Sequence, residues 1–317
     1  MEKLTVSSSP HLHTRESTQH IMRDVIIALV PAMIAAVVIF GWRALCLMVI
    51  SVVTCVLCEY ICRRIMKRDN TIGDLSAVVT GILLAMNVPS TLNPLMLMFG
   101  DFIAIVVVKQ AFGGIGQNFV NPALMARIFV MNAFPGAMAS WPKPMTADAA
   151  TSATPLGILK ETGHYSANYL QLFLGYRGGC LGETCALALI IGFVYLLARK
   201  VIAPTIPLVY IGTACLLSLL MGRDVLMDLL CGGLLLGAIF MATDYTTSPI
   251  TFKGQIIYAI GCGCLTMLIR RFGSLPEGVS YSIIIMNIIT PLIERGTHPR
   301  AFGKPKEEKK KKEAVRQ

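Results

Sequence analysis

Ten apolar stretches, each close to the length needed to cross a lipid bilayer, limit what this chain can fold into. A transmembrane helix needs about 20 mostly apolar residues. The stretches cover approximately 24–41, 43–63, 74–89 and 95–111, a fifth that ends near 134, and then 180–198, 204–221, 225–243, 253–270 and 279–293. With 55% hydrophobic residues, 15% charged residues and a mean hydropathy of +0.66, the composition excludes an ordinary soluble domain. The sequence predicts an all-α polytopic membrane protein with about ten transmembrane helices.

The apolar stretches divide the chain into five parts. A polar N-terminal segment at 1–22 is followed by a first membrane repeat at 23–134, a long loop at 135–179, a second membrane repeat at 180–299 and a basic tail at 300–317. No folded basic surface accompanies that tail, so we expect no nucleic-acid partner. We expect membrane lipid to be the main surroundings of the chain.

The distribution of basic residues predicts the orientation in the cell membrane. With ten spans, the basic tail, the loop Arg63–Arg68, Lys109 and the pair Arg199–Lys200 all fall on one side. Cytoplasmic loops carry an excess of Lys and Arg. We therefore expect both termini in the cytoplasm and the long loop at 135–179 on the outer face.

The two halves share a pattern that predicts an inverted repeat. In each half a short span breaks at a polar residue, and the following span ends at a basic residue. These are Asn87 and then Lys109 in the first half, and Asp244 and then Arg270 in the second. Five spans per half is an odd number, so the second copy must be inverted across the membrane. Such repeats hold a binding site at their interface, although chance similarity between apolar segments is the alternative.

Polar residues inside the apolar stretches are candidate functional groups, because an ionisable side chain is costly within a membrane. Asp101 lies in the middle of a stretch and is the clearest candidate for an ion pathway, with Glu59 and Asp244 as further candidates. Glu59, Glu183 and Asp244 lie nearer the stretch ends, where water can reach them. Asn121, directly before Pro122, is suited to cap a re-entrant helix whose positive end faces a flavin or an anion. A plain turn explains Asn121 and Pro122 equally well.

The ten cysteines and five histidines do not predict a metal site. Cys55, Cys58 and Cys62 share one helix face, but they lie in an apolar stretch, where cysteine behaves as a small buried hydrophobe. Cys262 and Cys264 lack the spacing of an iron–sulfur motif. All histidines lie outside the apolar stretches. We therefore expect that any cofactor is organic.

The long loop contains a short motif with a chemical meaning. Residues Asp148 to Thr154 follow the pattern Asp-x-x-Ser/Thr-x-Ala-Thr, with Thr151 at the Ser/Thr position. The pattern resembles the acceptor sequence at which a flavin transferase joins FMN to the last threonine through a phosphoester. The usual form has Gly where this chain has Ser152. An ordinary Ser/Thr loop that caps a helix beginning at Thr154-Pro155 is the alternative.

Together with the segment 109–122, which reads KQAFGGIGQNFVNP, this motif makes the chain resemble the D subunit of Rnf complexes, from Ser9 to about Pro299. The resemblance implies a ten-helix fold similar to urea transporters and a covalent FMN on Thr154. It implies an electron-relaying part of a translocase that couples ferredoxin:NAD oxidoreduction to Na⁺ or H⁺ transport. It also implies a second, non-covalent flavin (riboflavin or FMN), the A, B, C, E and G subunits as partners, and a flavin transferase for maturation.

Two basic residues depart from the expected orientation. Arg270 and Arg271 fall on the outer side, which is also the side of Thr154. Because the arginine fork suits phosphate recognition, we predict that at least one of them contacts the FMN or the loop that holds it. An exposed span end explains the pair as well. Lys109 and Asn121 are further candidate cofactor contacts.

Two other functions fit parts of the sequence. An inverted repeat alone is compatible with a passive small-solute channel of the urea-transporter type. A subunit that only supports assembly, without bound flavin, is the second alternative.

Overall fold

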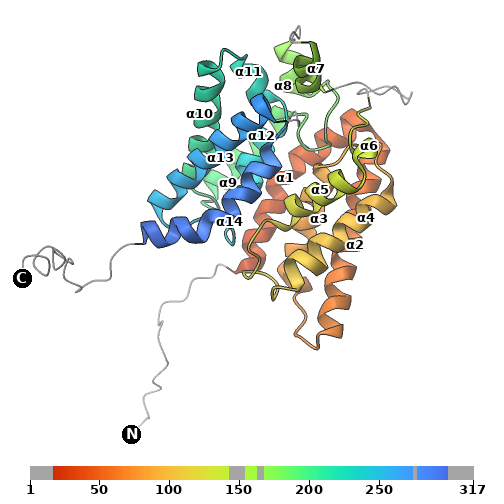
Figure 1. Ribbon diagram of the computed structural model, residues 1–317. Coiled ribbons are helices and arrows are strands. Elements are labelled where there is room, and N and C mark those ends of the chain that lie inside the picture. The colour runs from red at the N-terminus through yellow and green to blue at the C-terminus, as the bar shows by residue number, and fades with distance from the viewer. Residues whose placement is uncertain (1–16, 143–153, 163–167, 274–276, 299–317) are drawn as a thin grey trace, which may run out of the picture.

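The computed structural model describes residues 17–142, 154–162, 168–273 and 277–298. Within these ranges the chain forms fourteen α-helices, one 3₁₀ turn and two π-helical stretches, and it forms no β-strand. Figure 1 shows two groups of helices side by side, α1 to α6 in one and α9 to α14 in the other, with α7 and α8 at one end.

The helices of the first half begin and end as follows: α1 Thr18–Phe40, α2 Trp42–Ile65, η1 Ile72–Asp74, α3 Ser76–Met86, α4 Pro94–Phe102, η2 Ile103–Gln110, α5 Pro122–Ala133 and α6 Pro135–Met138. Two of these starts have a clear local cause. Pro94 and Pro122 occupy the first helical positions, and the side chains of Asn93 and Asn121 accept backbone N–H groups of the first turn.

The remaining helices are α7 Pro155–Thr162, α8 Tyr169–Leu174, α9 Ala186–Ala198, α10 Thr205–Leu220, α11 Val225–Leu230, α12 Leu234–Leu236, η3 Gly237–Met241, α13 Phe252–Phe272 and α14 Val279–Thr297. The side chain of Thr251 caps α13 by accepting the N–H of Gly254 at 3.1 Å. Each of the ten apolar stretches therefore contains helix, and the stretch at 225–243 is divided into α11 and the continuous pair α12–η3.

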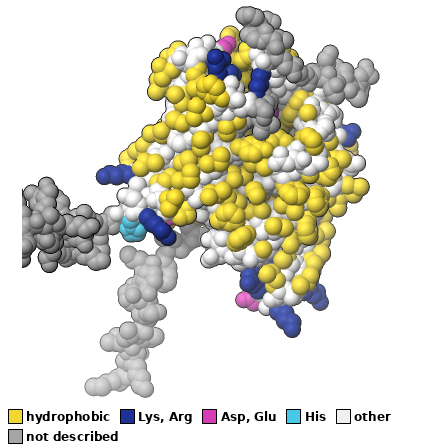
Figure 2. All heavy atoms as spheres, in the orientation of Figure 1, with side chains coloured by type: hydrophobic (Ala, Val, Ile, Leu, Met, Phe, Trp, Pro, Cys, Tyr) yellow, Lys and Arg dark blue, Asp and Glu magenta, His cyan; other side chains and the backbone are white. Residues whose placement is uncertain are grey.

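The surface and the helix lengths agree with a membrane protein. Among the described residues, α1, α2 and α13 are long and apolar enough to cross a membrane, and α3, α5, α9 and α10 are shorter apolar helices. In Figure 2 hydrophobic side chains cover the middle of the visible face, whereas Lys and Arg gather toward its ends. These findings confirm the predicted class, an all-α membrane protein.

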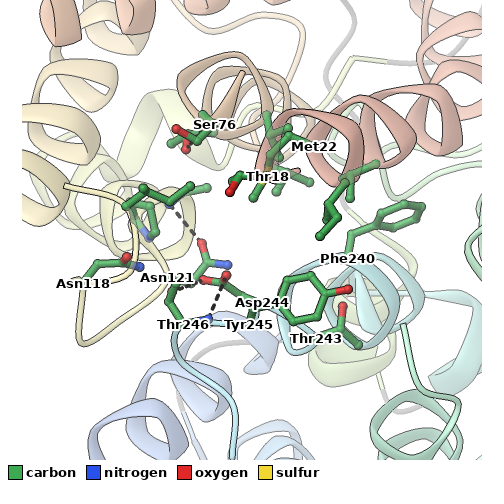
Figure 3. A pocket seen from close by; sticks show the side chains of 18 of the residues that line it. Thr18, Met22, Ser76, Asn118, Asn121, Phe240, Thr243, Asp244, Tyr245 and Thr246 are labelled. Carbon is green, nitrogen blue, oxygen red and sulfur yellow. Dashed lines mark hydrogen bonds between the residues drawn. The ribbon is translucent and has the colours of Figure 1, made fainter. Parts of the chain in front are cut away.

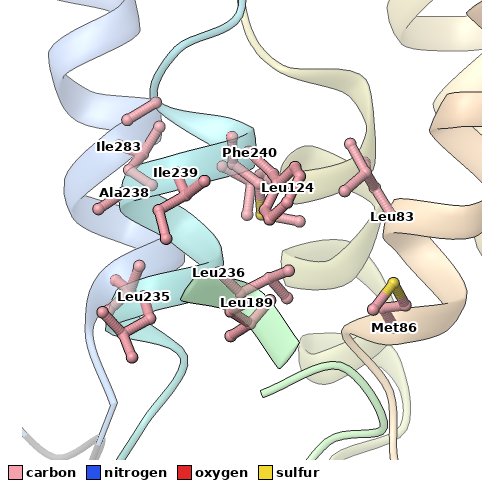
Figure 4. Packing of buried hydrophobic residues seen from close by; sticks show 14 of the residues in the cluster. Leu83, Met86, Leu124, Leu189, Leu235, Leu236, Ala238, Ile239, Phe240 and Ile283 are labelled. Carbon is pink, nitrogen blue, oxygen red and sulfur yellow. The ribbon is translucent and has the colours of Figure 1, made fainter. Parts of the chain in front are cut away.

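Small residues allow the helices to approach each other closely, as is typical of membrane proteins. The two halves meet where α1 packs against α9, and a side chain at Gly192 would overlap the carbonyl of Ala28 there. Within the first half, a Cβ at Gly81 of α3 would lie 3.0 Å from the backbone of Ser51 in α2. Leu83, Leu124, Leu189 and Phe240 fill the interior between the halves (Figure 4).

Two short buried helices enter the interior from different parts of the chain. The helix α3 begins after Leu75 and the pair α12–η3 begins after Gly233, and both preceding residues have left-handed backbone with φ near +62° and +67°. Their C-terminal ends meet, because Asn87 Nδ2 lies 3.6 Å from Met241 Sδ. Asn121 Nδ2 also donates to the Met241 carbonyl at 3.3 Å. Polar groups of both halves thus come together in the interior.

Candidate functional site

Thr154 lies at the N-terminus of α7. Its Oγ1 accepts the N–H of Gly157 at 3.1 Å, and its carbonyl accepts the N–H of Ile158 at 2.9 Å, so it is the helix cap. The residue is 8% exposed and borders a cavity of about 10 Å³, which is roughly the space for one water molecule. The other motif residues, Asp148, Thr151 and Ser152, lie outside the described residues.

Contacts with the second half hold the loop helices in place. Lys160 Nζ in α7 donates to the carbonyl of Gly273 at 2.5 Å, directly after α13. Tyr169 Oη at the start of α8 donates to Asp224 Oδ2 at 2.6 Å, and this hydrogen bond raises the pKa of Tyr169. The helix that follows Thr154 therefore lies at the same end of the molecule as the end of α13.

Two carboxylates line the Thr154 cavity. They belong to Glu183, in the non-helical segment 175–185, and Glu277, just before α14. The ligand atoms of Glu183, Glu277 and Cys180 lie within 4.8 Å of one another. This arrangement brings together parts of the chain that are about a hundred residues apart, so no local motif indicates it.

Arg127 of α5 is the counter-ion of this cluster. Its Nη2 forms an ion pair with Glu277 Oε2 and lies 3.5 Å from Cys180 Sγ. Its Nη1 donates to Asn87 Oδ1 at 3.2 Å and to Ser280 Oγ at 2.8 Å. The guanidinium is buried and joins the end of α3 to the start of α14, and so it links the two halves.

Arg177 completes the cavity wall. Its Nη2 donates to the backbone carbonyls of Glu183 at 2.7 Å and Leu230 at 2.5 Å. The side chain is buried, and its Nε has no hydrogen-bond partner among the described residues. A buried donor without a partner is costly.

Arg270 lies behind the same cavity. Its guanidinium donates to the carbonyls of Asp228 at 2.6 Å, Cys231 at 3.0 Å and Gly232 at 3.3 Å, and its Nε donates to that of Glu277 at 3.0 Å. A Cβ on Gly232 would lie 2.8 Å from Arg270 Nη2 and 2.5 Å from Leu156 Cδ1.

Arg270 is thus next to the segment that follows Thr154, although its donors bind backbone. Arg271 is exposed. Contact of either arginine with a flavin stays a prediction.

Lys109 occupies a comparable place in the first half. Its Nζ lies 3.0 Å from both carboxylate oxygens of Glu59 and donates to Ser76 Oγ, at the first residue of α3, at 2.5 Å. Glu59 also accepts from Gln110 at 2.8 Å and from Thr71 at 2.9 Å. Lys109 therefore anchors the start of α3, as Arg270 anchors the chain just before α12.

The three candidate ion-pathway residues lie in different surroundings. Asp101 is completely buried between α4 and α2, where its Oδ1 accepts from Ser51 at 2.6 Å and from Cys55 at 3.3 Å. Its Oδ2 has no partner among the described residues. Glu59 is ion-paired, whereas Asp244 organises a turn by accepting from the backbone N–H of Thr246 at 3.4 Å and from its hydroxyl at 3.1 Å. No contact between these three carboxylates appears in the described structure.

A larger cavity of about 370 Å³ lies between the halves, at the end of the molecule where α1 begins. Figure 3 shows Thr18 and Met22 of α1 on one side, Asn121 next to Asp244 on another, and Phe240 apart from both. Mostly apolar walls with a few polar groups are typical of a small-molecule site. Of the sequence candidates, Lys109, Asn121 and Asp244 line this cavity.

Sequence reasoning missed four residues around Thr154: Arg127, Arg177, Glu183 as a cavity residue, and Glu277. Two of them carried a usable signal. Glu183 is a carboxylate near the start of the stretch at 180–198. Arg127 is a charged residue inside the fifth apolar stretch, and the rule that singled out Asp101 applies to it equally.

Known proteins with similar sequences identify the family. A model of the NQR2, RnfD, RnfE family matches residues 5–303. The chain belongs to this family. It is 50% identical, over 98% of each chain, to the D subunit of the Na⁺-translocating ferredoxin:NAD⁺ oxidoreductase complex of Acetobacterium woodii. The D subunit of the proton-translocating complex of Clostridium ljungdahlii is 44% identical, over 94% of this chain and 96% of the other. The D subunit of an ion-translocating oxidoreductase complex of Stutzerimonas stutzeri is 37% identical, with coverage of 92% and 93%.

Proposed function

We propose that this chain is the D subunit of a membrane-bound, ion-translocating ferredoxin:NAD⁺ oxidoreductase complex, and that it carries FMN covalently on Thr154. The observation that carries the first part is the near full-length similarity to two D subunits with this activity in their names. The chain acts as one part of a translocase. Its partners are the A, B, C, E and G subunits, and a flavin transferase matures it.

The start of α7 suits a phosphoester on Thr154. The oxygen that would carry the phosphorus is already the cap of an eight-residue helix, and a helix N-terminus favours a phosphate group. A Cβ on Gly157 would lie 3.1 Å from Thr154 Oγ1, so this glycine keeps the space beside the oxygen open. Arg177 has a buried Nε without a partner in the described structure. When bound, FMN supplies the electron-transfer chemistry. The chain supplies the anchoring oxygen, the helix N-terminus and the nearby positive charge.

The experiment that tests attachment is the intact mass of the purified chain. Wild type should carry the mass of one FMN adduct, and Thr154→Ala should lack it, because only one hydroxyl is removed. Thr151→Ala is the matched control and should keep the adduct. Adduct loss in Thr151→Ala together with retention in Thr154→Ala would show that the wrong threonine was chosen. An unmodified wild-type chain would favour a channel or an assembly subunit.

For the membrane arrangement we propose ten crossings in two inverted five-helix repeats, similar to urea transporters. The halves support this in one specific respect. Each contains a short buried helix that follows a left-handed residue, and a basic residue from the next long helical segment anchors its start. These basic residues are Lys109 and Arg270.

In this arrangement both termini are cytoplasmic and the Thr154 loop faces outward. With native cysteines blocked or removed, a cysteine at Lys160 should react with an impermeant thiol reagent from outside the cell. A cysteine at Lys67 should not. The reverse result would move the Thr154 loop to the cytoplasmic face.

The cavity between the halves is our proposed site for the second flavin, riboflavin or FMN. Its volume of about 370 Å³ lies in the range of small-molecule sites, and Asn118 lines it with a side-chain amide that can bind a polar ring edge. Met22→Trp fills the cavity from α1. It should remove flavin that is extractable with acid and leave the adduct on Thr154. Unchanged extractable flavin in a folded Met22→Trp chain would exclude this cavity.

A further inference from the structure

The two carboxylates in the Thr154 cavity are unequally compensated. Glu277 forms an ion pair with Arg127. The carboxylate of Glu183, whose residue is 5% exposed, accepts one hydrogen bond in the described structure, from the N–H of Cys180 at 3.1 Å. Arg177 donates to the backbone carbonyl of Glu183 and not to its side chain. Among the described residues, Glu183 is therefore the cavity carboxylate that lacks a direct cationic partner.

The space around Glu183 is closed to a bulky ligand. A Cβ on Gly179 would lie 2.9 Å from Glu183 Oε1, and a Cβ on Gly233 would lie 2.8 Å from Oε2. The opening beside it is the cavity shared with Thr154, which is large enough for roughly one water molecule. A proton can reach Glu183 through this cavity, because a single water can carry it.

Opposing electrostatic effects act on Glu183. Burial and the nearby Glu277 favour the protonated form, because two close carboxylates in a low-dielectric site resist joint ionisation. The positive charges of Arg127 and Arg177 and the hydrogen bond from the Cys180 N–H favour the ionised form. The charged or titratable side chains that face this site are Glu277, Arg127, Arg177, Cys180, Cys231 and Arg270. Added negative charge at Thr154 would shift this balance toward protonation.

We propose that Glu183 is the redox-linked proton site of the flavin on Thr154. One proton from the outer solvent binds to the Glu183 carboxylate when one electron arrives on the flavin from a neighbouring redox subunit. The proton leaves when the electron leaves, and no other bond forms or breaks. Glu277 keeps its ion pair with Arg127 throughout. This inference rests on the proposed function.

The measurable consequence is a pH-dependent flavin potential. Uptake of one proton per electron changes the reduction equilibrium tenfold per pH unit, which equals about 59 mV for a one-electron couple. The flavin ring contributes its own pH dependence, and this part stays when Glu183 is changed. The difference in slope between wild type and a Glu183 variant therefore isolates the contribution of Glu183.

The experiment is a potentiometric titration of the covalent flavin in the purified complex over a series of pH values. The flavin potential of Glu183→Gln should depend less on pH than that of wild type. The difference should reach up to a tenfold change in the reduction equilibrium per pH unit. The control Glu294→Gln should match wild type, because Glu294 lies near the end of α14 and binds the N–H of Ile250. An unchanged slope in Glu183→Gln, or a loss seen only in Glu277→Gln, would overturn the assignment. A potential that follows Na⁺ concentration in place of pH would overturn it too.

A second measurement needs no variant and covers the case in which Glu183→Gln does not assemble. The reduced-minus-oxidised infrared difference spectrum of the wild-type complex should show a carboxylic acid C=O band that grows on reduction and shifts in D₂O. Absence of the band refutes the proposal. A chain without the FMN adduct would refute the proposed function itself, whereas an adduct with equal slopes would refute only the role of Glu183.

Discussion

The ion pair between Lys109 and Glu59 offers a quantitative test of how the first half is held together. The two side chains are 3% and 0% exposed, and Nζ lies 3.0 Å from both carboxylate oxygens. Lys109→Met removes the cation and leaves Glu59 buried, with hydrogen bonds from Thr71 and Gln110 alone. Breaking a buried pair from one side costs about 3–5 kcal/mol, because an uncompensated charge stays behind.

The chain contains a matched control. The pair of Arg199 with Asp24 has a similar distance of 3.2 Å, but the arginine side chain is 55% exposed. Such a pair contributes about 0–1 kcal/mol. We expect Lys109→Met to lower the thermal midpoint of the detergent-purified protein by on the order of 10 °C. Arg199→Met should lower it by only a few degrees, about a quarter of that effect or less.

The double variant separates charge from packing. In Lys109→Met combined with Glu59→Gln no charge is left behind, so the loss should be smaller than for Lys109→Met alone. Equal losses of thermal midpoint for Lys109→Met and Arg199→Met would refute the reasoning.

The Glu59→Gln variant also tests the predicted ion pathway. If Glu59 carries the transported ion, Glu59→Gln should abolish transport in a fully assembled complex. If Glu59 only anchors Lys109, transport should stay intact.

Three further predictions concern single positions. Asp101→Asn should impair ion pumping more than flavin content, because it removes a buried charge that Ser51 now binds; unchanged pumping in an assembled variant would contradict an ion-pathway role. Gly232→Ala should lower the thermal midpoint more than Gly222→Ala, since φ is near +70° at both but only Gly232 has side chains within 4 Å; equal losses would show that strain alone acts. Arg270→Ala should lower the midpoint potential of the covalent flavin, because removing a nearby cation disfavours the reduced anion, and an unchanged potential would refute contact with the flavin.

The helices were largely predictable from the sequence. The stretch expected at 43–63 is the helix Trp42–Ile65, and the stretch at 253–270 is the helix Phe252–Phe272. Both are long apolar runs, and their length alone gives the element. The stretch at 225–243 is equally apolar but is interrupted at Gly232 and Gly233, both with positive φ. A hydropathy profile does not show this interruption, because the interruption depends on backbone conformation. The two consecutive glycines were its only signal in the sequence.

The surroundings of Thr154 were much harder to predict than Thr154 itself. A local motif identifies the threonine, but the cavity beside it is lined by the start of α7, the segment before α9, the turn after α11 and Glu277 just before α14. Glu277 and Arg127 are 150 residues apart in sequence, and their ion pair depends on the packing of α14 against α5. Single-sequence reasoning finds such a pair only by noticing that each charge lies in apolar surroundings.

The structure also bears on the two arginines that depart from the expected orientation. The positive-inside rule concerns basic residues in short loops near the ends of membrane spans, where the charge stays on one side during insertion. In the folded chain Arg270 is 2% exposed, its donors bind four backbone carbonyls, and Asp228 lies 3.6 Å away as a counter-ion. An arginine bound in this way stabilises the break between α11 and α12, as Lys109 stabilises the start of α3. Of this pair only Arg271 is then exposed, and one exposed arginine weighs little against the outward orientation that we propose for the Thr154 loop.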